Sequence, residues 1–260
     1  MPRFAANLTL MFGEVPFLAR FDAAARAGFR AVEFVSPYDH PAEEVARAAR
    51  DAGVAVALFN LPPGDWARGD RGMACDPARA GEFAEGLDRA LAYAGALGCP
   101  RLHAMAGIRP KAVPEAELRA SWLAAIRLAA GALAREERTL VVEGINLRDM
   151  PGYYLTGSRQ AFGLMNEVAA PNLYYLYDVY HMQIMEGDLA TTIASRLARI
   201  GHVQIADVPG RHEPGTGEVN YRFLLRHLDA LGYGGVVGCE YRPLAGTVEG
   251  LGWMEEFRDG

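Results

Sequence analysis

Short apolar runs alternate with helix-forming segments along the whole chain, and this alternation limits the folds that the chain can adopt. The runs are continuously apolar, as expected of parallel strands that are covered on both faces. Strands are predicted at Phe4–Leu8, Ala31–Phe34, Val54–Phe59, Arg101–Met105, Leu140–Glu143, Leu173–Asp178, His202–Ile205 and Val236–Glu240. Helices are predicted at Phe17–Ala27, Ala42–Ala52, Asp76–Gly98, Pro114–Arg135, Arg159–Val168, Leu189–Ile200, Tyr221–Leu231 and Val248–Phe257. Such repeated strand–helix units are typical of α/β proteins.

The number and spacing of these units favour a closed barrel. The chain has 260 residues and shows no composition break or linker, so residues 1–260 are predicted to form a single-domain (β/α)8 TIM barrel. An open doubly wound sheet is the alternative. Its dinucleotide-binding form carries a glycine-rich fingerprint after the first strand, which this chain lacks, so we favour the barrel.

Composition narrows the range of functions. The formal net charge of −6 disfavours a nucleic-acid partner. No run reaches the roughly 18 apolar residues of a membrane helix, so no membrane association is expected. The single lysine, Lys111, lies in a polar segment between two prolines, whereas Schiff-base enzymes need a buried lysine. The three cysteines have no Cys-x-x-Cys spacing and fit the reducing cytoplasm, where we expect the protein.

Side chains with oxygen ligands stand at the ends of four successive predicted strands. They are Glu143, Asp178, Gln204 and Glu240, each separated from the next by about the length of one strand–helix–strand unit. A parallel barrel gathers the carboxyl ends of its strands around one axis, so these side chains are expected to meet. Carboxylate and amide oxygens are ligands of hard cations such as Mg²⁺ and Mn²⁺. The pattern therefore predicts a metal centre, and with it an enzyme.

Each of these four residues also has an ordinary explanation, because strand ends often carry polar side chains for solvation or helix capping. Four in register, each after an apolar run, favour the metal site, since a buried carboxylate without a partner is costly. Cys239 precedes Glu240 on the same strand, so its side chain should point the opposite way and is not predicted as a nucleophile. His103 and His202 lie inside strand runs and are predicted as core or supporting groups.

Two residues after these strands are candidates for substrate contact. His181 follows Asp178 closely, and it either touches a substrate oxygen or is satisfied by backbone groups at a helix start. Arg211 follows the seventh strand, and it either clamps a substrate carboxylate in bidentate fashion or is a solvated loop residue. The long segment Asn60–Cys75 after the third strand is of the kind that forms lids and binding loops.

Long segments of the chain resemble the hydroxypyruvate isomerases, a family of the xylose-isomerase-like TIM barrel superfamily. The resemblance is carried by RFAANLTLMFGEVPFLARF, FNLPPGDWARGDRGMAC, YDVYHMQIMEGDL, GHVQIADVPGRHEPGTGEVNY and VGCEYRP. Together these segments cover nearly the whole length, which makes the resemblance more specific than a short motif. A similar subgroup isomerises 2-oxo-tetronates, but the segment EGINLRDMPGYYLTG looks more like the hydroxypyruvate enzymes.

The resemblance implies roles for the strand-end residues. Glu143 and Glu240 match the superfamily's two glutamates, which act as acid and base and also ligate the metal. Asp178 and Gln204 are then metal ligands only. Related epimerases commonly have histidine at the position of Gln204, and the weaker amide donor shifts the expected metal toward Mg²⁺.

The resemblance also implies substrate-binding roles for His181 and Arg211, while Asp149, near a second acidic position of the epimerases, receives no role. The expected reaction interconverts hydroxypyruvate and tartronate semialdehyde (2-hydroxy-3-oxopropanoate) by glutamate-mediated proton transfer through a cis-enediolate. The expected partner is thus a small hydroxy-keto acid, and family analogy suggests a homo-oligomer. The alternatives are a 2-oxo-tetronate isomerase, a ketose 3-epimerase, a metal-dependent endonuclease-like barrel and a non-catalytic sugar-binding barrel.

Overall fold

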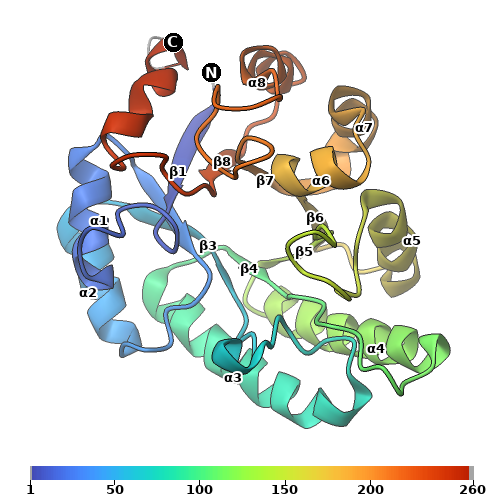
Figure 1. Cartoon of the computed structure of the whole chain (residues 1–260). Coiled ribbons are helices and arrows are strands. Elements are labelled where there is room, and N and C mark those ends of the chain that lie inside the picture. Colours follow the sequence, from blue (N-terminus) through green and yellow to red (C-terminus); the bar gives the residue numbers. More distant parts are fainter. Residues whose placement is uncertain (1, 258–260) are drawn as a thin grey trace.

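Eight parallel strands close into a barrel in the order β1 to β8, with β8 paired to β1. Figure 1 looks into this barrel in the computed structural model of the protein, which describes residues 2–257. The strands are β1 (Arg3–Asn7), β2 (Ala31–Phe34), β3 (Ala55–Asn60), β4 (Arg101–His103), β5 (Thr139–Glu143), β6 (Leu173–Asp178), β7 (Ile200–Ile205) and β8 (Val236–Cys239). The closed barrel confirms the predicted fold and excludes the open sheet. Residue 1 and residues 258–260 of the predicted domain lie outside the described residues.

Helices surround the barrel on its outside (Figure 1). They are α1 (Phe17–Arg26), α2 (Ala42–Ala52), α3 (Ala80–Leu97), α4 (Glu115–Ala134), α5 (Ser158–Val168), α6 (Val179–Met185), α7 (Leu189–Arg196) and α8 (Tyr221–Ala230). The described residues also form four 3-10 segments: η1 (Trp66–Arg68), η2 (Pro77–Arg79), η3 (Leu197–Arg199) and η4 (Glu249–Phe257). Among residues 2–257, none of the helices combines the length and the apolar character needed to cross a bilayer.

Two elements differ in kind from the sequence prediction. The predicted helix Val248–Phe257 is the 3-10 segment η4, which contains Gly250 and Gly252, residues that weaken an α-helix. Helix α6 is not predicted, because it is seven residues long and follows β6 without a loop. It exists at this place because the side chain of Asp178 caps its first turn.

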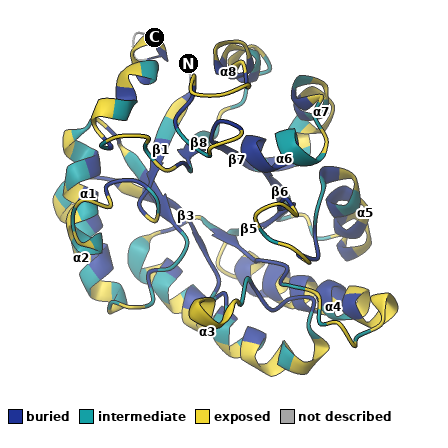
Figure 2. Ribbon diagram, viewed as in Figure 1, coloured by how far each residue is buried: buried dark blue, intermediate teal, exposed yellow. Residues whose placement is uncertain are grey.

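Buried residues follow the strands and the inward faces of the helices (Figure 2). In α2, for example, Val45 and Ala49 lie one turn apart and are buried, as an amphipathic helix on a sheet requires. At the amino end of β1, Phe4 packs edge-on against Trp253 of η4. The carboxyl ends of the strands instead hold the buried polar residues, so this end of the barrel is where chemistry is possible.

Candidate active site

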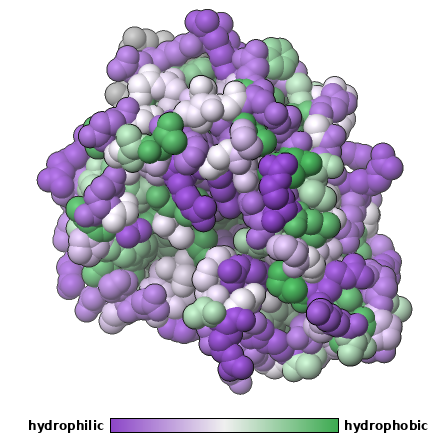
Figure 3. All heavy atoms as spheres, in the orientation of Figure 1, coloured by the Kyte–Doolittle hydropathy of each residue, from purple (hydrophilic) through white to green (hydrophobic). Residues whose placement is uncertain are grey.

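A cavity of about 540 Å³ lies at the carboxyl ends of the strands. Strands and loops from all around the barrel contribute to its wall. Its polar lining includes Asn7, Asn60, Arg71, His103, Glu143, Asp149, His181, Gln204, Arg211, Glu240 and Arg242. Hydrophilic residues also gather around the centre of the face that Figure 3 shows.

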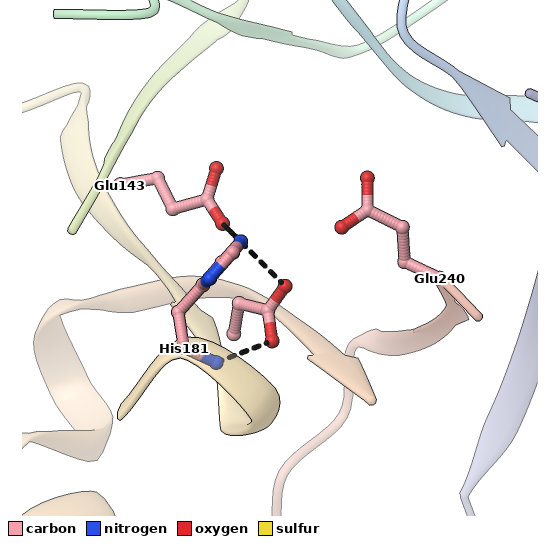
Figure 4. A group of neighbouring side chains, drawn as sticks. Glu143, His181 and Glu240 are labelled. Atoms are coloured by element: carbon pink, nitrogen blue, oxygen red, sulfur yellow. Dashed lines mark hydrogen bonds and ion pairs between the residues drawn. The ribbon is translucent and has the colours of Figure 1, made fainter. Parts of the chain in front are cut away.

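Four acidic or imidazole side chains meet in this region. Glu143, Asp178, His181 and Glu240 each bring one ligand atom within 4.8 Å of the others. Figure 4 shows Glu143, at the end of β5, and Glu240, just after β8, extending toward one another, with His181 beside Glu143. Gln204 lines the cavity as well and pairs in strand register with Asp178. The four side chains predicted as metal ligands therefore come together.

Three oxygen atoms of this group are buried and accept no hydrogen bond. They are Oε1 of Glu143, Oδ2 of Asp178 and Oε1 of Gln204, from three successive strands. Leaving a buried acceptor unpaired costs about 1–3 kcal/mol, and more for a charged group. A divalent cation is a partner that such oxygens can accept, and a set of oxygen atoms suits Mg²⁺ or Mn²⁺. The residues present therefore fit a divalent metal site.

The two oxygens of Asp178 have different tasks. Oδ1 accepts hydrogen bonds from the backbone N–H groups of Tyr180, at 2.7 Å, and His181, at 3.2 Å. These bonds cap α6 and fix the carboxylate, so that Oδ2 is left without a hydrogen bond, near Nε2 of His181 and Nη2 of Arg211. The same interaction that starts the helix also aims the ligand.

Both glutamates have a raised pKa. Burial raises the pKa of Glu143 well above its usual value, and repulsion from Asp178 and Glu240 raises it further. Burial raises the pKa of Glu240 to about 8, although Arg211 opposes the rise. The Nη2 atom of Arg211 lies 2.6 Å from Oε2 of Glu240. Carboxyl groups with a pKa near neutrality are typical of acid–base catalysts.

His181 is neutral at pH 7, because burial lowers its pKa to about 4. Its Nδ1 accepts a hydrogen bond from Nδ2 of Asn146 at 2.6 Å. Asp149 fixes the orientation of Asn146: its backbone N–H donates to Oδ1 at 2.8 Å, and its carboxylate accepts from Nδ2 at 3.2 Å. The proton of the neutral ring therefore sits on Nε2, which is 3.6 Å from Oδ2 of Asp178. A protonated Nε2 donates hydrogen bonds, so His181 is suited to a substrate oxygen rather than to a metal.

Glu33, the third residue of β2, is fully buried in the barrel. Its carboxylate accepts hydrogen bonds from Nε2 of His202 at 2.6 Å, Nε2 of Gln204 at 2.7 Å and Nδ2 of Asn7 at 3.1 Å. Because the amide of Gln204 turns its nitrogen to Glu33, its oxygen faces the other way. Gly238 leaves room for this arrangement, since a Cβ atom there would lie 2.4 Å from the carboxylate of Glu33. Glu33 thus sets which amide atom Gln204 presents to the metal site.

Comparison with known proteins places the barrel in a family. The family model for the xylose isomerase-like TIM barrel matches residues 21–257. The chain belongs to the xylose isomerase-like TIM barrel family. It is 51% identical to the 2-oxo-tetronate isomerase of Cupriavidus necator, over 99% of each chain. It is 46% identical to the hydroxypyruvate isomerase of Escherichia coli, over 99% of this chain and 100% of that one. A crystal structure of AP endonuclease, family 2, from Brucella melitensis has a TM-score of 0.97 and 48% identity, over 100% of both chains.

This membership confirms the predicted resemblance, and the two curated relatives are isomerases by name. In this xylose isomerase-like barrel, His181 and Arg211 line the same cavity as Glu143, Gln204 and Glu240, three of the four predicted ligands. The guanidinium of Arg211 lies among the acids, with Nη2 3.7 Å from Oδ2 of Asp178. The predicted binding loop Asn60–Cys75 also reaches the cavity. Contact of His181 and Arg211 with a substrate stays a prediction.

Several residues of the site are not predicted from the sequence. Glu33 has a recognisable signal, because an acidic residue inside the apolar run AVEF needs a buried partner. Asn7, which also donates to Glu240 at 3.3 Å, ends β1 with no distinctive pattern. Asn146 and Asp149 position His181 through contacts that only the folded loop creates. Cys239 is buried outside the cavity lining, and burial raises its pKa well above the usual thiol value, in line with a non-catalytic role.

Proposed function

We propose that this chain is a divalent-metal-dependent isomerase that interconverts hydroxypyruvate and tartronate semialdehyde. The observation that carries the proposal is the approach of two buried glutamates with raised pKa values, Glu143 and Glu240, beside unpaired buried oxygens of neighbouring strands. The names of the two curated relatives support the same reaction class.

Glu143, Asp178, Gln204 and Glu240 would hold the cation, Mg²⁺ or Mn²⁺, through their oxygen atoms. When bound, the cation supplies Lewis-acid polarisation of the carbonyl and hydroxyl oxygens of the substrate. The protein's own part is to fix three of those side chains on β5, β6 and β7 and the fourth directly after β8, and to keep the site small and largely buried.

The reaction transfers one hydrogen from C3 to C2 and a second from the C3 hydroxyl to the C2 oxygen. One of Glu143 and Glu240 removes the proton from C3, which leaves an enediolate, and a proton is returned at C2. His181 donates from Nε2 to a substrate oxygen as negative charge grows on it. Arg211, 2.6 Å from Glu240, favours the ionised form of that glutamate when it acts as the base. General acid–base catalysis of this kind contributes about 10² to 10⁴ in rate.

The same chemistry on a four-carbon acid is the second candidate. The 51% identity to a 2-oxo-tetronate isomerase favours it, and a cavity of about 540 Å³ accommodates either acid. The Brucella protein is named an endonuclease. In the present chain the metal cluster offers three carboxylates and one histidine, and the net charge is −6, which is the opposite of a surface built for DNA phosphates.

Substrate profiling of the Mg²⁺- and Mn²⁺-loaded protein tests the proposal. Hydroxypyruvate, 2-oxo-tetronate and ketohexoses are compared, and turnover of the first with incorporation of solvent deuterium is expected. Glu240→Gln should lower turnover by about 10² to 10⁴. Glu218→Gln, in the exposed loop after β7, is the matched control and should keep full activity. Near wild-type turnover by Glu240→Gln would overturn the assignment, and turnover of ketohexoses alone would favour an epimerase.

We also propose that the protein works in the reducing cytoplasm and forms a homo-oligomer. Cys75, Cys99 and Cys239 are free and buried, which suits the reducing cytoplasm. A homo-oligomer is expected from the family, and light scattering of the purified protein measures its size.

A further inference from the structure

We propose that Arg71, on the loop between β3 and α3, binds the carboxylate of the substrate in a bidentate pair. This inference rests on the proposed function, because it names the part of the cavity that selects a 2-oxo acid over a neutral ketose. Arg71 and its neighbour Trp66 both line the cavity that holds the glutamates. Arg71 is partly buried there and belongs to the loop Asn60–Cys75.

The loop fixes the backbone on both sides of Arg71. On one side, Oδ2 of Asp70 accepts from the backbone N–H of Asp65 at 2.7 Å and pairs with Nη1 of Arg79 at 2.9 Å. On the other side, Gly72 forms an antiparallel bridge with Ala106, just beyond β4. Only glycine fits there, since a Cβ atom at Gly72 would lie 2.4 Å from the carbonyl oxygen of Met105. The backbone from which the side chain of Arg71 extends is therefore held in one conformation.

The side chain of Arg71 is also held in place. Its Nη1 donates to the backbone carbonyls of Trp66, at 3.1 Å, and Asp70, at 2.6 Å. Its guanidinium carbon stacks 3.7 Å from the centre of the Trp66 ring. Within residues 2–257, the Nε and Nη2 atoms of Arg71 have no hydrogen-bond or ion-pair partner. These two atoms form one edge of the guanidinium, and that edge matches the two oxygens of a carboxylate.

The other arginines of the cavity are less suited to this task. Arg211 uses Nη2 on Glu240, so its charge is already shared with the acids of the site. Arg242 is exposed, and no described side chain or backbone group orders its guanidinium. It adds positive charge at the same cavity without a fixed geometry. Among the described residues, Arg71 is thus the cavity arginine whose Nη1 is held by the protein while both Nε and Nη2 are left without a partner; in Arg211 only Nε is left so.

The charges of the site require such a group. The three carboxylates of the cluster would be balanced by a bound divalent cation together with Arg211. A substrate carboxylate therefore brings one negative charge that the centre itself leaves uncompensated. A charge-assisted pair with Arg71 supplies the missing positive charge and fixes the orientation of the acid. A neutral ketose makes no use of this pair, so Arg71 acts on specificity.

The test compares hydroxypyruvate with dihydroxyacetone, in which a hydroxymethyl group replaces the carboxylate. For Arg71→Gln, kcat/KM for hydroxypyruvate should fall about 10- to 150-fold, as expected for loss of a hydrogen bond between charged groups. The constant for dihydroxyacetone, KM if it is turned over and Ki if it is not, should stay unchanged. Arg71→Lys keeps the charge without the paired edge and should lie between wild type and Arg71→Gln. Arg68→Gln, three residues earlier on the same loop and outside the cavity lining, should behave as wild type.

Two results would overturn the proposal. One is an unchanged kcat/KM for hydroxypyruvate in Arg71→Gln, and the other is an equal loss for both compounds, which would assign Arg71 a purely structural role in the loop. If the wild-type protein turns over no 2-oxo acid, the proposed reaction fails separately. Calorimetric binding of glycerate to the metal-loaded protein then decides the inference: it stands if Arg71→Gln loses this binding and Arg68→Gln keeps it, and falls otherwise.

Discussion

The first half of the barrel (β1 to β4) and the second half (β5 to β8) both bury polar side chains at the carboxyl ends of the strands. In the first half, called the paired half below, these side chains are mostly hydrogen-bonded to one another; in the second, the unpaired half, several are not. At the ends of β5, β6 and β7, oxygens of Glu143, Asp178 and Gln204 are buried without a hydrogen-bond partner. At the ends of β1 and β3, Asn7 donates to Glu33 and Asn60 bonds to His103 at 3.2 Å. Burial alone therefore does not mark a ligand. The mark is an unsatisfied acceptor, which a native protein keeps only for a reason.

Side chains of the first half of the barrel nevertheless orient the site residues of the second half. Glu33 on β2 holds the amide nitrogen of Gln204 on β7, across the barrel interior. Asn7 on β1 joins Glu33 to Glu240, which follows β8. His103 on β4 is only half paired. Its Nδ1 forms a hydrogen bond with Asn60, while its Nε2 has no hydrogen-bond partner and lies 3.7 Å from Oε2 of Glu143. The paired half is thus a support for the unpaired half.

The largest effect is expected from a change in the unpaired half. Asp178→Asn keeps an oxygen that caps α6 but is expected to turn an NH₂ group toward the cation in place of Oδ2. Because the cation contributes several kcal/mol to catalysis, kcat/KM should fall by at least about 10². Metal content by mass spectrometry should fall with it, while the circular dichroism spectrum stays that of the wild type. A variant that retains one bound metal per chain would show that an unpaired oxygen does not identify a ligand here.

A smaller effect is expected from the paired half. Glu33→Gln replaces one of the two acceptor oxygens of Glu33 by an NH₂ group, so Gln204, His202 and Asn7 compete for a single oxygen and the amide of Gln204 is no longer firmly oriented. Loss of such a supporting contact typically weakens metal binding about 10- to 100-fold. Titration of the metal-free protein with Mn²⁺, followed by the electron paramagnetic resonance signal of the free ion, measures this change.

The double variant Glu33→Gln/Gln204→Glu is the matched control for that experiment. It exchanges donor and acceptor across the same contact, so one hydrogen bond is restored and a carboxylate oxygen faces the site. Its Mn²⁺ affinity should return toward that of the wild type. If Glu33→Gln binds Mn²⁺ as tightly as the wild type, Glu33 fills space and does not orient Gln204.

The sequence predicts the unpaired half better than the paired half, and the reason is physical. Glu143 and Asp178 each end an apolar run, and Gln204 is the second-to-last residue of the next one, so a single polar residue near the end of each strand indicates a change of environment. A closed parallel barrel then brings such ends together whatever the detail of the loops. Fold and cluster therefore follow from short-range patterns and one rule of topology.

The supporting contacts depend on pairs that are distant in sequence. Glu33 and His202 are 169 residues apart, and the sequence around either residue does not indicate that the other is its hydrogen-bond partner. The position of Arg71 depends on a bridge between Gly72 and Ala106 that exists only in the folded loop. Helix α6 is too short to show a helical period in the sequence. Its N-cap, Asp178, is equally well explained from the sequence as a metal ligand, so it does not indicate a helix start. The contacts that orient the site residues can therefore be found only in the folded structure.

A smaller effect is expected in the pH dependence of stability, through Glu240 at the end of the unpaired half. In the metal-free protein burial raises the pKa of Glu240 from its ordinary value of 4.5 to about 8. Since the folded pKa is the higher one, the unfolded state loses its proton first as pH rises. Stability of the metal-free protein should therefore fall between about pH 4.5 and 8 and stay low above. Thermal unfolding at pH 5 and pH 8.5 measures this: Glu240→Gln should match the wild type at pH 5 and exceed it at pH 8.5. A wild-type Tm that rises across this range would contradict the raised pKa.

The smallest effect on activity is expected one residue away from Glu240. Cys239 lies on β8 with its side chain buried away from the cavity lining, and burial raises the pKa of its thiol well above the usual value. A neutral thiol outside the site has no means of reacting with the substrate. Cys239→Ala should leave kcat/KM unchanged and lower the free energy of unfolding by about 1 kcal/mol, measured by urea denaturation. A loss of activity comparable to that of Glu240→Gln would mean that the two faces of β8 are not separate in function, and the division of the barrel into a chemical interior and a packing exterior would fail at this strand.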